Sequence, residues 1–205
     1  PASLDFATAS AGVIDASNRI VAPGLVDTHV QLREPGFEED ETIESGGRAA
    51  LAGGFSSIAC LPNTNPPIDT PAGVEFIRQK AARARQAHVH VIGCISKNRD
   101  GKELAEIGTL VEAGAVGFST SRTILHRAKD GELVPGTNAE DEQVLGIGRV
   151  LGEVGHGVFE VASDLAPLAD ELAWMKHPGR ETGRPVAFAF CQSPVEPVQW
   201  RQLLA

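Results

Sequence analysis

Short apolar runs alternate along the chain with longer stretches in which apolar residues recur every three or four positions. The short runs predict β-strands and the longer periodic stretches predict α-helices. The predicted strands are 25–32, 56–61, 88–95, 115–119, 157–162 and 185–191, and the predicted helices are 41–52, 71–86, 102–113, 139–154, 168–182 and one beginning near Pro194.

Strict alternation of strands with helices indicates βα units and a parallel sheet. The strands are apolar throughout, as expected where both faces of a sheet are covered. A closed (β/α)8 barrel needs eight strands and about 250 residues, whereas this chain has 205 residues and six βα units. We therefore predict an α/β fold, an incomplete (β/α)8 TIM-type barrel over residues 23–205. Residues 1–22 are predicted to form a short β-hairpin that precedes the barrel.

Charge and composition narrow the function classes. The net charge of −9 disfavours a general nucleic-acid surface, but one buried arginine can still attract a small anionic substrate. No window predicts a membrane span or a secretion signal. Three cysteines without framework spacing favour a reducing compartment, and so a cytoplasmic location.

The first predicted strand carries the most informative chemistry. Asp27, His29 and Gln31 alternate with Thr28 and Val30, so the three polar residues share one face of the strand. Strand ends are where barrels hold their catalytic groups. His29 there suits either a metal ligand or a hydrogen-bonded histidine. Gln31 offers a neutral carboxamide, a weak zinc ligand. Asp27 would either orient a ligand or bond backbone.

Two further polar residues follow the first and second strands. Arg33 and Asn63 are suited to a shared carboxylate site, because a guanidinium clamps a carboxylate with two parallel hydrogen bonds and a carboxamide can contact the same group. The alternatives are a surface ion pair for Arg33 and turn chemistry for Asn63.

Cysteine and histidine supply the remaining candidate ligands. Cys60 ends the second strand, so its thiolate could replace a lost imidazole; the alternative is a small buried hydrophobe. His88 and His90 form a literal His-x-His pair. Because they open the third strand rather than close it, we expect a structural role at the opposite end of the barrel.

Four segments together resemble a known family. Residues 21–36, 53–67, 101–108 and 112–119 are similar to dihydroorotases of the amidohydrolase superfamily, a likeness covering about residues 11–119. It implies a zinc-dependent barrel that opens or closes a cyclic amide in pyrimidine biosynthesis. His29 would be a metal ligand, Gln31 would stand where the family normally has histidine, and Arg33 and Asn63 would bind the substrate carboxylate.

Beyond the fourth strand the resemblance changes. Residues 114–123, 155–164 and 181–186 are similar to D-aminoacylase-type amidohydrolases, which predicts a junction of two family branches near 115–120. Both branches place ligand histidines on strands five and six. The nearest polar residues here are Glu160 and Gln192.

Three hypotheses follow, none with an assigned catalytic residue. The first is a dihydroorotase-like hydrolase acting on dihydroorotate or carbamoyl aspartate, present here as an impaired fragment or chimera. The second is an N-acyl-D-amino-acid amidase in which Cys60 helps to hold one zinc ion. The third is a non-catalytic pseudoenzyme subunit whose open barrel edge binds a second copy or a partner chain.

Overall fold

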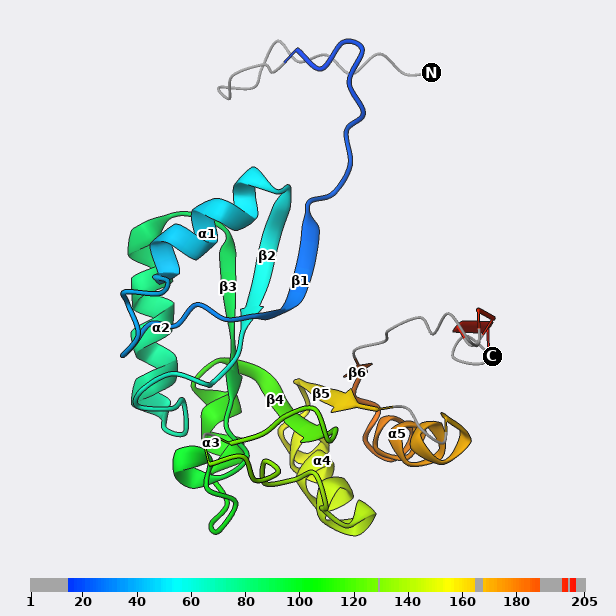
Figure 1. Cartoon of the computed structure of the whole chain (residues 1–205). Helices are drawn as coiled ribbons and strands as arrows, with labels where there is room; N and C mark the ends of the chain where they lie inside the picture. The colour runs from blue at the N-terminus through cyan, green and yellow to red at the C-terminus, as the bar shows by residue number, and fades with distance from the viewer. Residues whose placement is uncertain (1–14, 129, 165–167, 189–196, 199, 202–205) are drawn as a thin grey trace.

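Six parallel strands form one sheet whose spatial order follows the chain, β1-β2-β3-β4-β5-β6. The computed structural model describes residues 15–128, 130–164, 168–188, 197–198 and 200–201. The strands are β1 (Leu25–Val30), β2 (Phe55–Cys60), β3 (His88–Gly93), β4 (Ala115–Arg122), β5 (Val158–Ser163) and β6 (Val186–Phe188). The sheet curls along this order (Figure 1), which confirms the predicted incomplete (β/α)8 barrel.

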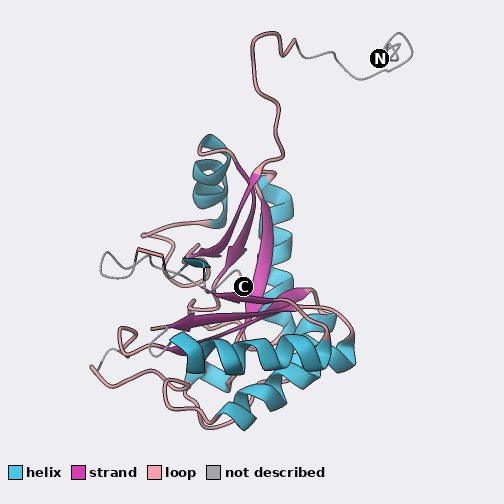
Figure 2. Ribbon diagram, turned by 90° about the vertical axis from the view of Figure 1, so that its right-hand side faces the viewer, coloured by secondary structure: helices cyan, strands magenta, loops and turns pink. Residues whose placement is uncertain are grey.

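Helices connect the strands and cover one face of the curled sheet (Figure 2). They are α1 (Ile43–Ala52), α2 (Pro71–Ala84), α3 (Ile107–Glu112), α4 (Asp141–Val154) and α5 (Leu168–Thr182), with a short 3-10 helix, η1 (Lys97–Arg99). Two apolar clusters fill the space between helices and sheet. One contains Ile58 and Val74. The other contains Phe118 and Phe159, whose ring centroids lie 4.7 Å apart.

Helix starts are fixed by side chains in the sequence. The Thr42 hydroxyl accepts the backbone N–H of Ser45 at 3.1 Å, and the Ser45 hydroxyl accepts that of Thr42 at 3.0 Å. This reciprocal capping satisfies donors that the first turn of α1 leaves free. Thr70 precedes α2 in the same way, followed by Pro71 at the first helical position, where its missing N–H costs nothing.

Two predicted elements differ from the structure. The helix expected over 102–113 begins only at Ile107, because Leu104 pairs with Ser96 in an antiparallel bridge and Ala105 donates its N–H to the Ile95 carbonyl at 2.8 Å. Residues 15–24 contain no strand and lead away from the sheet (Figure 1); Ile20 there is 96% exposed. The rest of the predicted hairpin, and the start of the helix expected near Pro194, lie outside the described residues.

Polar side chains gather on the inner face of the curl, opposite the helices. They include His29 of β1, Ser119 of β4 and Glu160 of β5, which are in hydrogen-bond contact with one another through Glu160. Within the described part of the chain, no helix is long and apolar enough to cross a membrane.

Candidate functional site

The inner face is organised around a contact between β1 and β5. Nδ1 of His29 lies 3.2 Å from Oε1 of Glu160, across 131 residues of sequence. The Ser119 hydroxyl donates to the other carboxylate oxygen of Glu160, and these two residues are register partners on β4 and β5. Glu160 is only 6% exposed. Both oxygens of this buried carboxylate are therefore hydrogen-bonded, as burial of a charge requires.

The electrostatics of His29 follow from this contact. The hydrogen bond to Glu160 raises the pKa of the imidazole, and the negative charges of Glu160 and Asp27 act in the same direction, while partial burial opposes them. Asp27 accepts the backbone N–H of His29 at 3.0 Å. Of the two roles predicted for Asp27, the backbone hydrogen bond is the one that the structure contains.

The loops after β1 and β2 are tied together. Asn65 donates its N–H to the Pro35 carbonyl, and Leu61 donates to the Val30 carbonyl, each at 2.9 Å. Gly36 has φ +97°, and a β-carbon there would lie 2.2 Å from the Asn65 carbonyl oxygen. These contacts bring the loop that carries Arg33 against the loop that carries Asn63, as a shared binding site for these two residues would require.

A buried carboxylate holds the first of these loops on the helix layer. Glu34, 6% exposed, accepts the N–H of Ile43 at 2.9 Å and lies 2.7 Å from Nζ of Lys80. The N-terminus of α1 and the side of α2 thus both fix Glu34, the residue immediately after Arg33. Arg33 itself is half-buried and has φ +60°.

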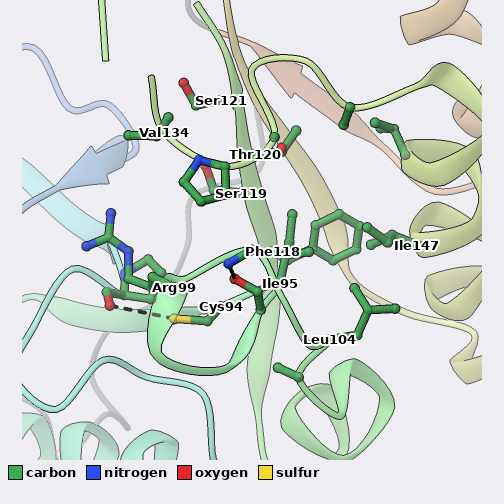
Figure 3. Close-up of a pocket in the computed structure, with 18 of the residues that line it drawn as sticks. Cys94, Ile95, Arg99, Leu104, Phe118, Ser119, Thr120, Ser121, Val134 and Ile147 are labelled. Carbon is green, nitrogen blue, oxygen red and sulfur yellow. Dashed lines mark hydrogen bonds between the residues drawn. The ribbon is translucent and has the colours of Figure 1, made fainter. Parts of the chain in front are cut away.

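A cavity of about 1640 Å³ opens at the carboxyl ends of the strands, the edge at which barrels bind their ligands. His29, Gln31 and Asn63 line it, whereas Arg33 does not appear among its lining residues. Figure 3 shows a polar part along the end of β4 and an apolar part on the helix side; the labelled residues of these two parts are Ser119, Thr120 and Ser121, and Leu104, Phe118 and Ile147.

Asn63 has an unusual environment within this cavity. Its Oδ1 atom is buried and has no hydrogen-bond partner among the described residues. A buried polar atom without a partner costs about 1–3 kcal/mol. The Oδ1 acceptor of Asn63 is therefore left unsatisfied by the described part of the chain.

Cys60 lies elsewhere. It is 1% exposed and belongs to the apolar cluster between sheet and helices, with Ile58 and Val74. Burial raises the pKa of its thiol to about 12, so the thiolate that zinc binds is disfavoured. These surroundings give no support to Cys60 as a ligand and fit the alternative, a small buried hydrophobe.

His88 and His90 occupy the first and third positions of β3. Their strand begins at the end of the sheet opposite the cavity, where we predicted them to lie. Neither residue lines the cavity. The literal His-x-His pair of this chain is thus separate from the candidate site.

The side chains present at the strand ends do not fit a zinc ion. Among the described residues, no three His, Cys, Asp or Glu side chains form a group that could hold a metal. Both oxygens of Glu160 are already hydrogen-bonded within the protein, and His29 offers only its Nε2 atom. Gln31 is exposed and supplies only a neutral carboxamide. Gln192, the polar residue expected near the end of strand six, lies outside the described residues.

Sequence analysis named Glu160 as the polar residue nearest the ligand position expected on the fifth strand but assigned it no role. The sequence contains an indication of its role. Glu160 is the only charged residue in the apolar run 157–162, and charged residues that are buried are almost always paired. Its partner was not readable, because the contact depends on how far the sheet curls between β1 and β5.

Comparison with protein families identifies a match over residues 18–130 to the family described as dihydro-orotase-like. Among curated relatives, a dihydroorotase of Syntrophotalea carbinolica is 43% identical over 154 residues, covering 70% of this chain and 36% of the relative. A dihydroorotase of Pelobacter propionicus is 42% identical over 183 residues, covering 80% of this chain and 43% of the relative. The chain thus spans less than half the length of these relatives.

The second of these matches extends past the fourth strand, since 80% of the chain is more than its first 119 residues. The likeness to dihydroorotases therefore continues beyond the stretch in which the motifs show it. The predicted junction near 115–120 and the resemblance to D-aminoacylase-type enzymes stay predictions.

Solved structures agree on the fold. An L-hydantoinase (dihydropyrimidinase) from Arthrobacter aurescens superposes with a TM-score of 0.68 at 21% identity, covering 98% of this chain and 49% of that one. A dihydroorotase from Saccharomyces cerevisiae, solved with 5-fluoroorotic acid, gives 0.56 at 15% identity, covering 90% and 53%. At these identities the likeness concerns the fold alone.

Proposed function

The chain belongs to the dihydro-orotase-like family, and we propose that it serves a hydrolase that opens and closes the ring of dihydroorotate. The product of ring opening is carbamoyl aspartate, so the proposed role lies in pyrimidine biosynthesis, in the cytoplasm. Because the chain spans less than half the length of the curated relatives, this activity is a proposal for the whole protein. The chain's own share is the binding of the substrate.

Asn63 carries the proposal. It follows β2 in the stretch that resembles the second-strand motif of dihydroorotases, and it lines the cavity with His29. Its buried Oδ1 lacks a donor among the described residues, and the amide N–H of a cyclic ureide, or the carbamoyl group of the opened product, supplies one. The Nδ2 group of the same carboxamide can donate to the substrate carboxylate.

Arg33 supports the same assignment. Its loop is held against the Asn63 loop by the bond between Asn65 and Pro35 and is anchored by Glu34. A guanidinium at this position can form two parallel hydrogen bonds with a carboxylate. We propose that it binds the carboxylate once a ligand is in place.

Isothermal titration of the chain with dihydroorotate and with carbamoyl aspartate tests this proposal. We expect saturable binding that weakens about tenfold in Asn63→Ala and about tenfold to a hundredfold in Arg33→Gln, the loss of one neutral or one charged hydrogen bond. Arg83→Gln, on α2, is the control and should bind as the unchanged chain does. Equal affinity in all four proteins would refute the assignment.

A second candidate function, the non-catalytic subunit, has one observation in its favour. Zinc is expected of the family, yet the donors at the described strand ends do not fit it. Turnover separates the two candidates: conversion of dihydroorotate that is lost in Asn63→Ala favours the hydrolase. Binding without turnover favours a subunit whose open edge, at β1 or β6, binds a second copy or a partner chain.

A further inference from the structure

We propose that the position where the family would hold a metal ion binds none in this chain. Because Gln31 is a poor ligand and Glu160 bonds His29, this position holds an imidazole–carboxylate pair formed by His29 and Glu160. This pair, rather than a zinc ion, would then contact a ligand bound in the cavity. This inference rests on the donor atoms of the described residues and is independent of which amide the cavity binds.

The carboxylate nearest the expected metal position has both of its oxygens in hydrogen bonds. Zinc needs ligands with a free lone pair, commonly four. Nδ1 of His29 is 3.2 Å from Oε1 of Glu160, and Oε2 accepts the Ser119 hydroxyl. Both oxygens of Glu160, the carboxylate nearest the expected metal position, are therefore bonded to the protein, and His29 retains only Nε2 as a possible ligand atom. A metal would have to break contacts of a carboxylate that is 6% exposed.

Further ligands for a metal ion are too few among the described residues. Gln31 directly follows β1 and lines the same cavity as His29, but a carboxamide oxygen is a neutral ligand. Asp27 accepts the backbone N–H of His29 at 3.0 Å. In the part of the chain that the structure describes, no three His, Cys, Asp or Glu side chains form a group that could hold a metal ion.

The pair leaves one ring nitrogen of His29 free of contacts with the described residues. No described residue hydrogen-bonds Nε2 of His29, whose side chain is 41% exposed and lines the cavity. A carboxylate that bonds Nδ1 fixes the orientation of the ring and leaves Nε2 for the ligand. Glu160 is thus a positioning residue, and the cavity-facing group is one edge of an imidazole.

Calorimetric titration of the metal-free chain with zinc chloride tests the proposal. We expect no saturable uptake by the unchanged chain. In the double variant Gln31→His/Glu160→His, three imidazoles share the strand ends and the competing carboxylate is gone, so we expect one equivalent of zinc. If the double variant does not fold, the single variant Gln31→His, changed at an exposed position, replaces it in the test. We expect this single variant to bind zinc, with lower affinity than the double variant.

Each outcome of the zinc titration either upholds or overturns the proposal. Zinc uptake by the unchanged chain that is lost in His29→Ala overturns the proposal. Uptake that survives His29→Ala and is lost in His90→Ala comes from the pair at the opposite end of β3 and upholds it. A folded double variant without zinc uptake also overturns it, because Glu160 and Gln31 would then not be what prevents binding. Failure of dihydroorotate to bind leaves all three results unchanged.

Discussion

Asn65 donates its backbone N–H to the carbonyl of Pro35 at 2.9 Å, and this bond joins the loops that carry Asn63 and Arg33. Gly36 makes the approach possible. Its φ is +97°, and a β-carbon at this position would lie 2.2 Å from the Asn65 carbonyl oxygen. The proposed binding site therefore depends on a glycine in the loop that carries Arg33.

Gly36→Ala should destabilise the fold and separate the two loops. The substitution adds a steric clash with backbone to the cost of a left-handed conformation, which is about 1–2 kcal/mol for a residue with a β-carbon. Urea denaturation measures the change. Gly54→Ala is the matched control, because Gly54 has φ +86° and a β-carbon added there would have no neighbouring atom within 4 Å. An equal loss in both variants would show that the loop contact contributes nothing.

Glu34→Ala should cost about 2–3 kcal/mol of unfolding free energy, since it removes a charged hydrogen bond to Ile43 and the partner of Lys80. The control is Glu75→Ala. Glu75 pairs with Arg78 at 3.6 Å, both half exposed, and should change stability by less than about 0.5 kcal/mol. If Glu34→Ala unfolds at the same urea concentration as its control, the anchor assigned to Glu34 does not exist.

Cys60 should react slowly with iodoacetamide at pH 8 in the folded chain. Burial raises the pKa of its thiol to about 12, so little thiolate is present, and the side chain is also inaccessible. Peptide mass spectrometry follows the modification of Cys60 specifically. Denatured protein is the comparison and should react quickly. Fast labelling of Cys60 in the folded chain would place it outside the core.

The sequence predicted the fold well because each strand and helix is encoded locally. The alternation of apolar runs with helical periodicity is sufficient for a parallel sheet, and five of the predicted helices exist. The helix expected over 102–113 failed at its first turns for a non-local reason: Leu104 pairs with Ser96, a contact that periodicity within the segment does not report.

The site was predictable only in part. The position of His29 at a strand end follows from the register of β1, and the neighbouring loops of Arg33 and Asn63 follow from the parallel order. The role of Glu160 did not follow, since its contact with His29 spans 131 residues and depends on the curl of the sheet. The side on which Cys60 lies depends on how β2 packs against the helix layer, and sequence alone left it open.

Glu160 holds the imidazole of His29, and nuclear magnetic resonance titration of that imidazole is the decisive test of this contact. A histidine whose pKa is raised in the folded state contributes stability that is complete below its unfolded pKa and is lost as pH rises through the folded pKa. The contact predicts a His29 midpoint above the ordinary value of 6.5 and a lower midpoint in Glu160→Gln. The same midpoint in both proteins would show that Glu160 does not hold the imidazole.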